Sequence, residues 1–191
     1  MRTLLLAPLF LLATAAAQAG WQLEQPSELT FMSFKNTHLA EIHRFNRMQG
    51  NIAEDGEATL SIDLTSVDTA IAIRDTRMQE MLFETSRFAS ATLTAKVNTK
   101  VLQQAAAGAI QTYDLTGKLN LHGLEADVSV PVLIVPAADG RLVVTSLKPV
   151  LVQADQFELT AGIQKLRDIA KLERISEVVP VNFTLIFSPK P

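Results

Sequence analysis

The densest group of charges in the sequence is formed by Arg74, Asp75 and Arg77. If these residues begin a helix, Asp75 lies in its first turn, where the helix dipole favours a carboxylate, and the two arginines are solvated. The alternative is a clamp for an anionic head group at the mouth of a pocket, since a guanidinium matches the geometry of a phosphate. Both interpretations stay open, and Arg74 and Arg77 are our candidates for head-group contacts.

The histidines do not have the spacing of a metal site. His38 and His43 are five residues apart, so on a helix they are turned about 140° from each other, and on a strand they face opposite sides. A helical zinc motif needs histidines four residues apart, and the third histidine, His122, lies in an expected turn. The sequence therefore predicts hydrogen-bonded or solvated histidines, no metal and no cofactor.

Motifs for other kinds of chemistry are also missing from the sequence. There is no cysteine and no Gly-x-Ser-x-Gly, so thiol nucleophiles, disulfides and a nucleophile elbow are excluded. No glycine-rich stretch ends in the Lys-Ser/Thr of a phosphate-binding loop. The formal net charge of −3 gives no general attraction for nucleic acid. We therefore expect a protein that is not an enzyme and does not bind nucleic acid.

The first 19 residues have the pattern of a cleaved secretory signal. Residues 1–3 carry one positive charge, Leu4–Ala17 is a run of apolar and small residues, and Ala17-Gln18-Ala19 fits a signal-peptidase site. The apolar run is too short to span a bilayer, which takes about 20 apolar residues, and no later stretch is longer. We predict a periplasmic protein whose mature chain begins at Gly20 and has no membrane span.

The rest of the sequence is dominated by alternation of apolar and polar residues. A period of two is typical of antiparallel strands with one buried and one wet face. The clearest runs are residues 60–64, 91–98, 113–121, 124–134 and 179–187. His122-Gly123 separates two of them closely enough to predict a hairpin.

Two segments have apolar residues at helical spacing instead, residues 73–84 and 163–172. The stretch 103–108 is a loop or a frayed helical turn by composition. Two short helices cannot cover a sheet of this size, so the sheet buries its apolar face by closing on itself. A barrel of about eight strands can hold one small ligand. A β-sandwich is the structural alternative.

Five motifs follow one another along the chain: Asp63–Thr69, Ile73–Met78, Leu82–Glu84, Ala91–Leu93 and Leu115–Gly123. Together they resemble the YceI-like family of exported, lipocalin-like β-barrels. The resemblance implies an all-β, mainly antiparallel fold, in which residues 20–191 form a single extended lipocalin-like β-barrel with one or two short helices. It also implies an elongated apolar cavity that can bind an isoprenoid-type lipid.

We therefore expect an exported protein that carries or sequesters an amphipathic lipid, such as a polyprenyl or quinone-like molecule. The residues expected to line the cavity are the inward-facing strand positions and the apolar positions of the first helix. They are Leu60, Ile62, Met78, Met81, Phe83, Leu93, Tyr113, Leu115, Leu119, Val128, Val130, Phe183 and Leu185.

Two other functions are compatible with the same sequence. A hydrolase or isomerase acting on such a lipid would use Asp75, Glu84 or His122, because titratable groups sealed in an apolar pocket acquire shifted pKa values. A barrel filled with side chains would instead act through its outer surface on a protein partner. Small inward residues such as Gly117 and Ala91 leave room and argue against a filled barrel. An exposed edge strand could also pair two copies into a homodimer.

Overall fold

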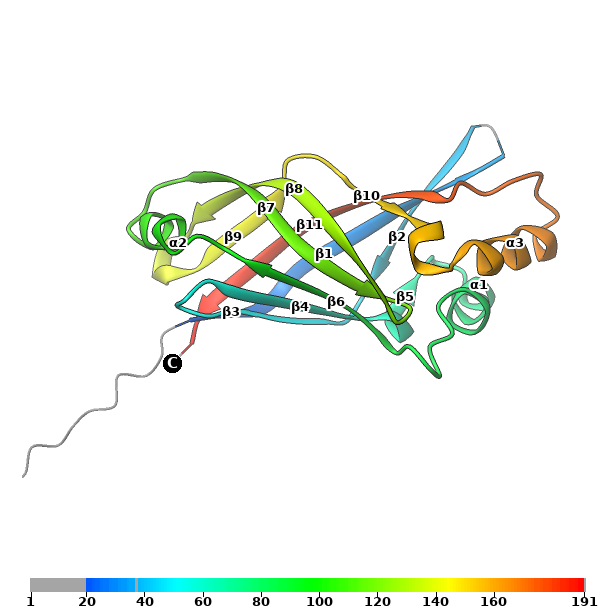
Figure 1. Ribbon diagram of the computed structural model, residues 1–191, viewed down its shortest axis with the longest axis horizontal. Coiled ribbons are helices and arrows are strands. Elements are labelled where there is room, and N and C mark those ends of the chain that lie inside the picture. Colours follow the sequence, from blue (N-terminus) through cyan, green and yellow to red (C-terminus); the bar gives the residue numbers. More distant parts are fainter. Residues whose placement is uncertain (1–19, 37, 191) are drawn as a thin grey trace, which may run out of the picture.

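The computed structural model describes residues 20–36 and 38–190, so the predicted signal of residues 1–19 lies outside the described residues. Figure 1 shows an elongated barrel with helices at both ends. The strands are β1 (Trp21–Lys35), β2 (Leu39–Phe45), β3 (Met48–Ile52), β4 (Glu57–Asp63), β5 (Val67–Asp68), β6 (Ser90–Lys96), β7 (Gln111–Leu121), β8 (Leu124–Pro136), β9 (Leu142–Ser146), β10 (Val150–Gln153) and β11 (Val178–Pro189). The α-helices are α1 (Ala72–Arg77), α2 (Thr99–Ala106) and α3 (Thr160–Ile169). One turn of π-helix, η2 (Met78–Leu82), and three short 3₁₀ turns, η1 (Leu64–Ser66), η3 (Ala138–Gly140) and η4 (Ala154–Phe157), complete the described elements.

Eight of the strands form a closed antiparallel barrel in the order β11-β9-β8-β7-β6-β4-β3-β1, and the pairing of β1 with β11 closes the ring. Three strands extend this ring. β10 pairs with the beginning of β11, while β2 pairs with β1 and carries the two-residue β5. The barrel is therefore confirmed as the fold, and the β-sandwich alternative is wrong.

The predicted hairpin at His122-Gly123 joins β7 to β8, whose facing residues at the turn are Leu121 and Leu124. His122 and Gly123 have φ angles of 53° and 79°. Two successive positive φ values are those of a type I′ turn, whose twist matches that of the flanking strands. A Cβ atom on Gly123 would lie 2.9 Å from the ring of Phe88, so glycine also provides the room that this ring needs.

One end of the barrel is closed by α2, where the sequence predicted a loop or a frayed turn. The helix begins earlier than the Gln- and Ala-rich stretch, because the side chain of Asn98 accepts a hydrogen bond from the backbone N–H of Lys100 at 2.9 Å and caps it. Leu102 and Ala105, three residues apart on one face, are fully buried in the barrel. The helix therefore owes its stability to packing that composition alone does not reveal.

The opposite end is covered by α1, η2, η4 and α3, with the hairpin of β1 and β2 projecting beside them (Figure 1). Both predicted helical segments are confirmed, although the second begins and ends earlier than its apolar stripe suggested. α3 lies close against η2: a Cβ atom on Gly162 would come within 2.6 Å of the Met81 carbonyl oxygen. Among the described helices, none is long and apolar enough to cross a membrane.

Candidate functional site

A cavity of about 410 Å³ occupies the half of the barrel next to α1, η2 and α3. This volume lies within the range of small-molecule sites, roughly 300–1,000 Å³. A smaller cavity of about 70 Å³ continues toward α2, and Leu60, Leu93, Leu115 and Phe183 line both. The two cavities follow the long axis of the barrel, so together they fit an elongated rather than a compact ligand.

Most of the side chains predicted to line a cavity do so. The larger cavity contains Leu60, Ile62, Met78, Phe83, Leu93, Leu115, Leu119, Val128, Val130 and Phe183, together with Arg74 and Arg77 at its mouth. Tyr113 and Leu185 line only the smaller cavity. That these residues contact a ligand stays a prediction.

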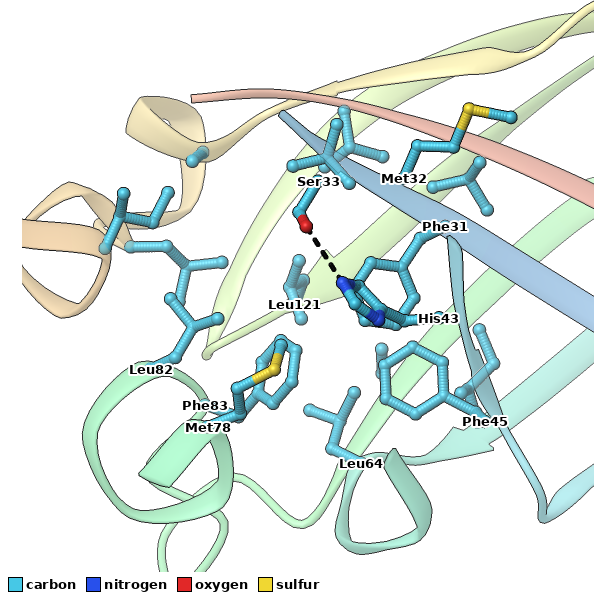
Figure 2. A pocket seen from close by; sticks show the side chains of 18 of the residues that line it. Phe31, Met32, Ser33, His43, Phe45, Leu64, Met78, Leu82, Phe83 and Leu121 are labelled. Carbon is cyan, nitrogen blue, oxygen red and sulfur yellow. Dashed lines mark hydrogen bonds between the residues drawn. The ribbon is translucent and has the colours of Figure 1, made fainter. Parts of the chain in front are cut away.

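Met81 lines neither cavity, contrary to its predicted position. On an α-helix Met78 and Met81 would share one face. Here the backbone N–H of Phe83 donates to the carbonyl oxygen of Met78 at 2.9 Å, five residues back, as in a π-helix. The wider turn brings Met78, Leu82 and Phe83 to the cavity in place of Met81 (Figure 2).

Sequence reasoning missed the contribution of β1 and β2. Phe31 lies opposite His43 in the β1–β2 ladder, and its ring stacks on that of Phe45 with the centroids 5.2 Å apart. All three side chains line the cavity (Figure 2). The stretch Phe31-Met32-Ser33-Phe34 does not alternate between apolar and polar residues, so the period that revealed the other strands was absent.

A polar pair on the wall of the cavity is formed by Ser33 and His43, whose Oγ and Nε2 atoms are hydrogen-bonded at 2.8 Å (Figure 2). The side chain of His43 is buried, and its Nδ1 atom has no hydrogen-bond partner among the described residues. Burial lowers the pKa of His43, and the positive charge of Arg74 lowers it further. The imidazole is therefore neutral at pH 7.

Charged side chains lie at the mouth of the cavity, around the carboxylate of Glu41. Lys35 and Arg74 both form ion pairs with Glu41, and the Arg74 Nη1 atom lies 2.5 Å from its Oε2 atom. Burial alone would raise the pKa of Glu41, but the hydrogen bond from Lys35 and the charge of Arg74 outweigh it and hold the pKa of this carboxyl below its usual value. Glu41 is therefore ionised at pH 7 and neutralises part of the positive charge at the mouth.

The two candidate head-group arginines differ in their surroundings. Besides its ion pair with Glu41, Arg74 donates to Thr69 through Nε, at 2.8 Å from the hydroxyl oxygen, and through Nη2, at 2.6 Å from the carbonyl oxygen. Asp75 accepts from the same Thr69, at 2.8 Å from its backbone nitrogen. The half-buried Arg77 lines the cavity and forms no ion pair with a described residue. Arg77 is the more available of the two for a ligand.

The groups proposed for catalysis lie outside the cavities. His122 contacts the carbonyl oxygen of Phe157 through Nδ1 at 3.1 Å, and its ring packs on Phe88 with the centroids 4.4 Å apart. Its Nε2 atom lies 4.0 Å from the carboxylate of Glu84. Neither these two groups nor Asp75 lines either cavity. His122 joins the β7–β8 turn to η4, and Asp75 anchors the start of α1 through Thr69. Both roles are structural.

The barrel is not filled with side chains in the half next to α1. Leu93, Leu115 and Leu119 point inward yet are only partly buried, because they face the cavity. Toward α2 only the smaller cavity of about 70 Å³ is left open, and Val132 and Leu142, which line it, are each only 1% exposed. The alternative of a barrel fully packed with side chains is therefore wrong, because the half next to α1 holds the larger cavity. Among the residues that the structure describes, no cluster could hold a metal ion.

An eight-stranded antiparallel barrel with a long apolar cavity and helices over its mouth defines the lipocalin-like class of folds. The model of the YceI-like domain matches residues 21–187, and the chain belongs to this family, as its motifs indicated. A comparison with curated proteins finds no match.

Solved structures agree with this assignment. A polyisoprenoid-binding domain from Saccharophagus degradans, implicated in plant cell wall breakdown, is 36% identical and superposes with a TM-score of 0.85 over 91% of this chain and 99% of that domain. BcnA from Burkholderia cenocepacia shares the fold at 21% identity and a TM-score of 0.65, over 84% of this chain and 95% of that one. The Campylobacter jejuni YCEI protein does so at 16% identity and a TM-score of 0.53, over 83% of this chain and 91% of that one.

Proposed function

We propose that this protein binds an amphipathic isoprenoid lipid, of the polyprenyl or quinone-like type, and carries or sequesters it in the periplasm without chemical turnover. The observation that carries the proposal is the cavity of about 410 Å³, which is lined by aliphatic and aromatic side chains and has its charged groups only at the mouth. Burial of apolar surface contributes about 25 cal/mol per Å², so a hydrocarbon chain enclosed there is held without directional contacts.

The arrangement of polar groups supports one orientation of the ligand. The hydrocarbon chain would run along Leu60, Leu93 and Leu115 toward α2, where the two cavities meet. The head group would stay at the mouth near Arg77, next to the pair of Ser33 and His43. The 36% identical polyisoprenoid-binding domain supports the choice of lipid. Absence of turnover is supported by Asp75, Glu84 and His122, which lie outside both cavities.

Periplasmic export rests on residues 1–19, and pairing of two copies rests on the exposed edge strands. Both stay predictions of the sequence. Sequestration requires that most of the lipid be shielded from water, which the packing of α2 at one end and of η2 against α3 beside the mouth supports. A lipid held in this way would leave the mouth of the barrel as its route of entry and exit.

Organic extraction and mass spectrometry of protein purified from its native periplasm test the proposal. We expect a stoichiometric isoprenoid lipid in the extract. The variant Leu115→Glu puts a charge into the cavity, where it is costly to bury, and should carry none, whereas Thr116→Glu on the outer face of the same strand should carry as much as the wild type. An empty extract from folded wild-type protein, or equal lipid in both variants, would overturn it.

A further inference from the structure

The mouth of the cavity is bordered by exposed isoleucines. Ile71, Ile73 and Ile169 line the cavity, yet they are 47%, 58% and 40% exposed. Single exposed apolar residues are ordinary, but several gathered at one opening mark an interaction surface. Ile71 immediately precedes α1, Ile73 lies in α1 and Ile169 ends α3, and these two helices flank the opening.

The hairpin of β1 and β2 lies at the same end of the barrel (Figure 1) and carries further exposed apolar side chains. Phe34, Leu39 and Ile42 are 40%, 57% and 66% exposed. The hairpin is fixed to the mouth by the ion pair of Glu41 with Arg74 and by the hydrogen bond from the backbone N–H of Asn36 to the carbonyl oxygen of Arg174, 2.9 Å long. We call the six exposed side chains Phe34, Leu39, Ile42, Ile71, Ile73 and Ile169 the rim.

The segments that carry the rim are basic, although the protein is acidic. Residues 33–45, 71–77 and 160–174 contain eight Lys and Arg against four Asp and Glu, whereas the whole chain has a net charge of −3. Arg77, Lys165 and Lys171 form no ion pair with a described residue. An anionic partner would therefore meet unneutralised positive charge around the opening, while the rest of the molecule repels it.

We infer that the rim is a docking surface for an anionic lipid bilayer, which goes beyond the binding of a lipid inside the barrel. A bilayer satisfies both features at once, because its hydrocarbon takes up the rim side chains and its phosphates attract the lysines and arginines. A docked mouth also lets an isoprenoid chain move between bilayer and cavity without exposing its apolar surface to water. The transfer of an isoprenoid chain between bilayer and cavity rests on the proposed function, whereas docking to the bilayer does not.

Flotation with vesicles tests the docking directly. The exported protein is mixed with vesicles of phosphatidylethanolamine and phosphatidylglycerol in a 3:1 ratio, or of phosphatidylcholine alone. We expect binding to the anionic vesicles that weakens with added salt. The double variant Ile71→Ser/Ile73→Ser should bind about tenfold more weakly, because each lost side chain no longer inserts into the bilayer.

Matched variants separate the rim from general surface effects. Ile110→Ser removes an isoleucine that is 64% exposed at the α2 end, and it should bind vesicles like the wild type. The double variant Lys165→Glu/Lys171→Glu should also bind the anionic vesicles about tenfold more weakly, since each positive charge near an anionic surface contributes to binding. Lys100→Glu on α2 should bind them like the wild type. Serine at position 71 can cap α1, so the rim variant should stay folded.

The lipid content of the same preparations keeps the two proposals apart. Wild-type protein that carries lipid but does not float with anionic vesicles overturns the docking surface alone. Binding of the rim to a protein partner instead of to the vesicles would overturn it as well. Equal vesicle binding by the wild type and the isoleucine double variant overturns it too. Protein that floats but carries no lipid after purification contradicts the lipid-binding function and leaves the docking surface standing.

Discussion

The guanidinium of Arg74 forms an ion pair with Glu41, 2.5 Å between Nη1 and Oε2, that ties α1 to the β1–β2 hairpin across the mouth of the cavity. Arg77, one turn later on the same helix, has no such partner among the described residues and lines the cavity. Two arginines that are equivalent in the sequence therefore have different tasks. Arg74 holds the mouth together, and Arg77 is free to meet a ligand.

This difference predicts opposite effects of two matched variants. Arg74→Gln should lower the free energy of unfolding by about 1–2 kcal/mol, because it leaves Glu41 and Thr69 without their shared donor. Arg77→Gln should change it by less than about 0.5 kcal/mol but weaken binding of a phosphorylated isoprenoid relative to the alcohol. Urea unfolding and a lipid titration measure the two quantities. Equal losses of stability would contradict the assignment.

Burial of His43 predicts a pH dependence of stability. Because the pKa of His43 is lowered in the folded protein, the unfolded chain takes up a proton near its ordinary pKa of about 6.5, whereas the folded protein resists it. The contribution is therefore fully present above about pH 7 and is lost as the pH falls toward 5. The lowered pKa of Glu41 acts in a separate pH window. Below about pH 4.5 the unfolded chain takes up a proton at this carboxyl while the folded protein resists it, so this contribution to stability is lost as the pH falls further.

Urea unfolding at a series of pH values checks this prediction. The free energy of unfolding of wild-type protein should fall between pH 7 and pH 5, and His43→Phe, beside Phe31 and Phe45, should flatten that part of the curve. His38→Phe alters an exposed histidine of the same hairpin and should leave the curve unchanged. If the curves of wild type and His43→Phe were parallel, another group would be responsible.

The sequence predicts the barrel well because its long strands alternate strictly. In β7, for example, Tyr113, Leu115 and Leu119 fall on one face by parity, and that face lines the cavities. Parity could not reveal β1, where Phe31 to Phe34 break the alternation. It also could not place Met81, since nothing in the sequence distinguishes a π-turn from an α-turn. In the folded protein this turn lies against Gly162, which is far away in the sequence.

The charged groups of the site were the least predictable part. Glu41 and Arg74 are 33 residues apart, and only the pairing of β1 with β2 and the packing of α1 bring them together. The sequence predicted that His43 is hydrogen-bonded or solvated, but its burial against Phe31 depends on the same pairing. Contacts between distant segments of this kind carry no local periodicity, so they appear only when the chain is folded.

Phe183 lies where the two cavities meet, and this position predicts an effect on the chain length of the bound lipid. It is 8% exposed and lines both cavities, whereas Phe187, four residues further along β11, lines only the smaller. Phe183→Ala should join the cavities and shift the bound lipids toward longer isoprenoid chains. Phe187→Ala should lose a similar amount of stability, about 3–5 kcal/mol, without that shift. Mass spectrometry of extracts from both variants decides, and unchanged chain lengths in Phe183→Ala would refute the role of this ring.

Filling the cavity should separate ligand binding from stability, and β8 offers a matched pair of valines. Val128 lines the larger cavity and is only partly buried, whereas Val132 is 1% exposed and lines only the smaller cavity of about 70 Å³. Val128→Phe has empty space to enter, so the lipid-free protein should unfold no more easily than the wild type while retaining less lipid. Val132→Phe has much less space to enter, so it should overpack this region and lose about 1–3 kcal/mol of stability.

Thermal or urea unfolding of delipidated protein, followed by lipid titration, measures both effects. Retention of lipid by Val128→Phe at the wild-type level would mean that the ligand does not occupy the space next to β8. A loss of stability in Val128→Phe as large as in Val132→Phe would mean that this half of the barrel has no room for a phenyl ring. The proposed binding of a hydrocarbon chain in the larger cavity predicts neither result. Val128 borders this cavity of about 410 Å³, whereas Val132 borders only the smaller one of about 70 Å³.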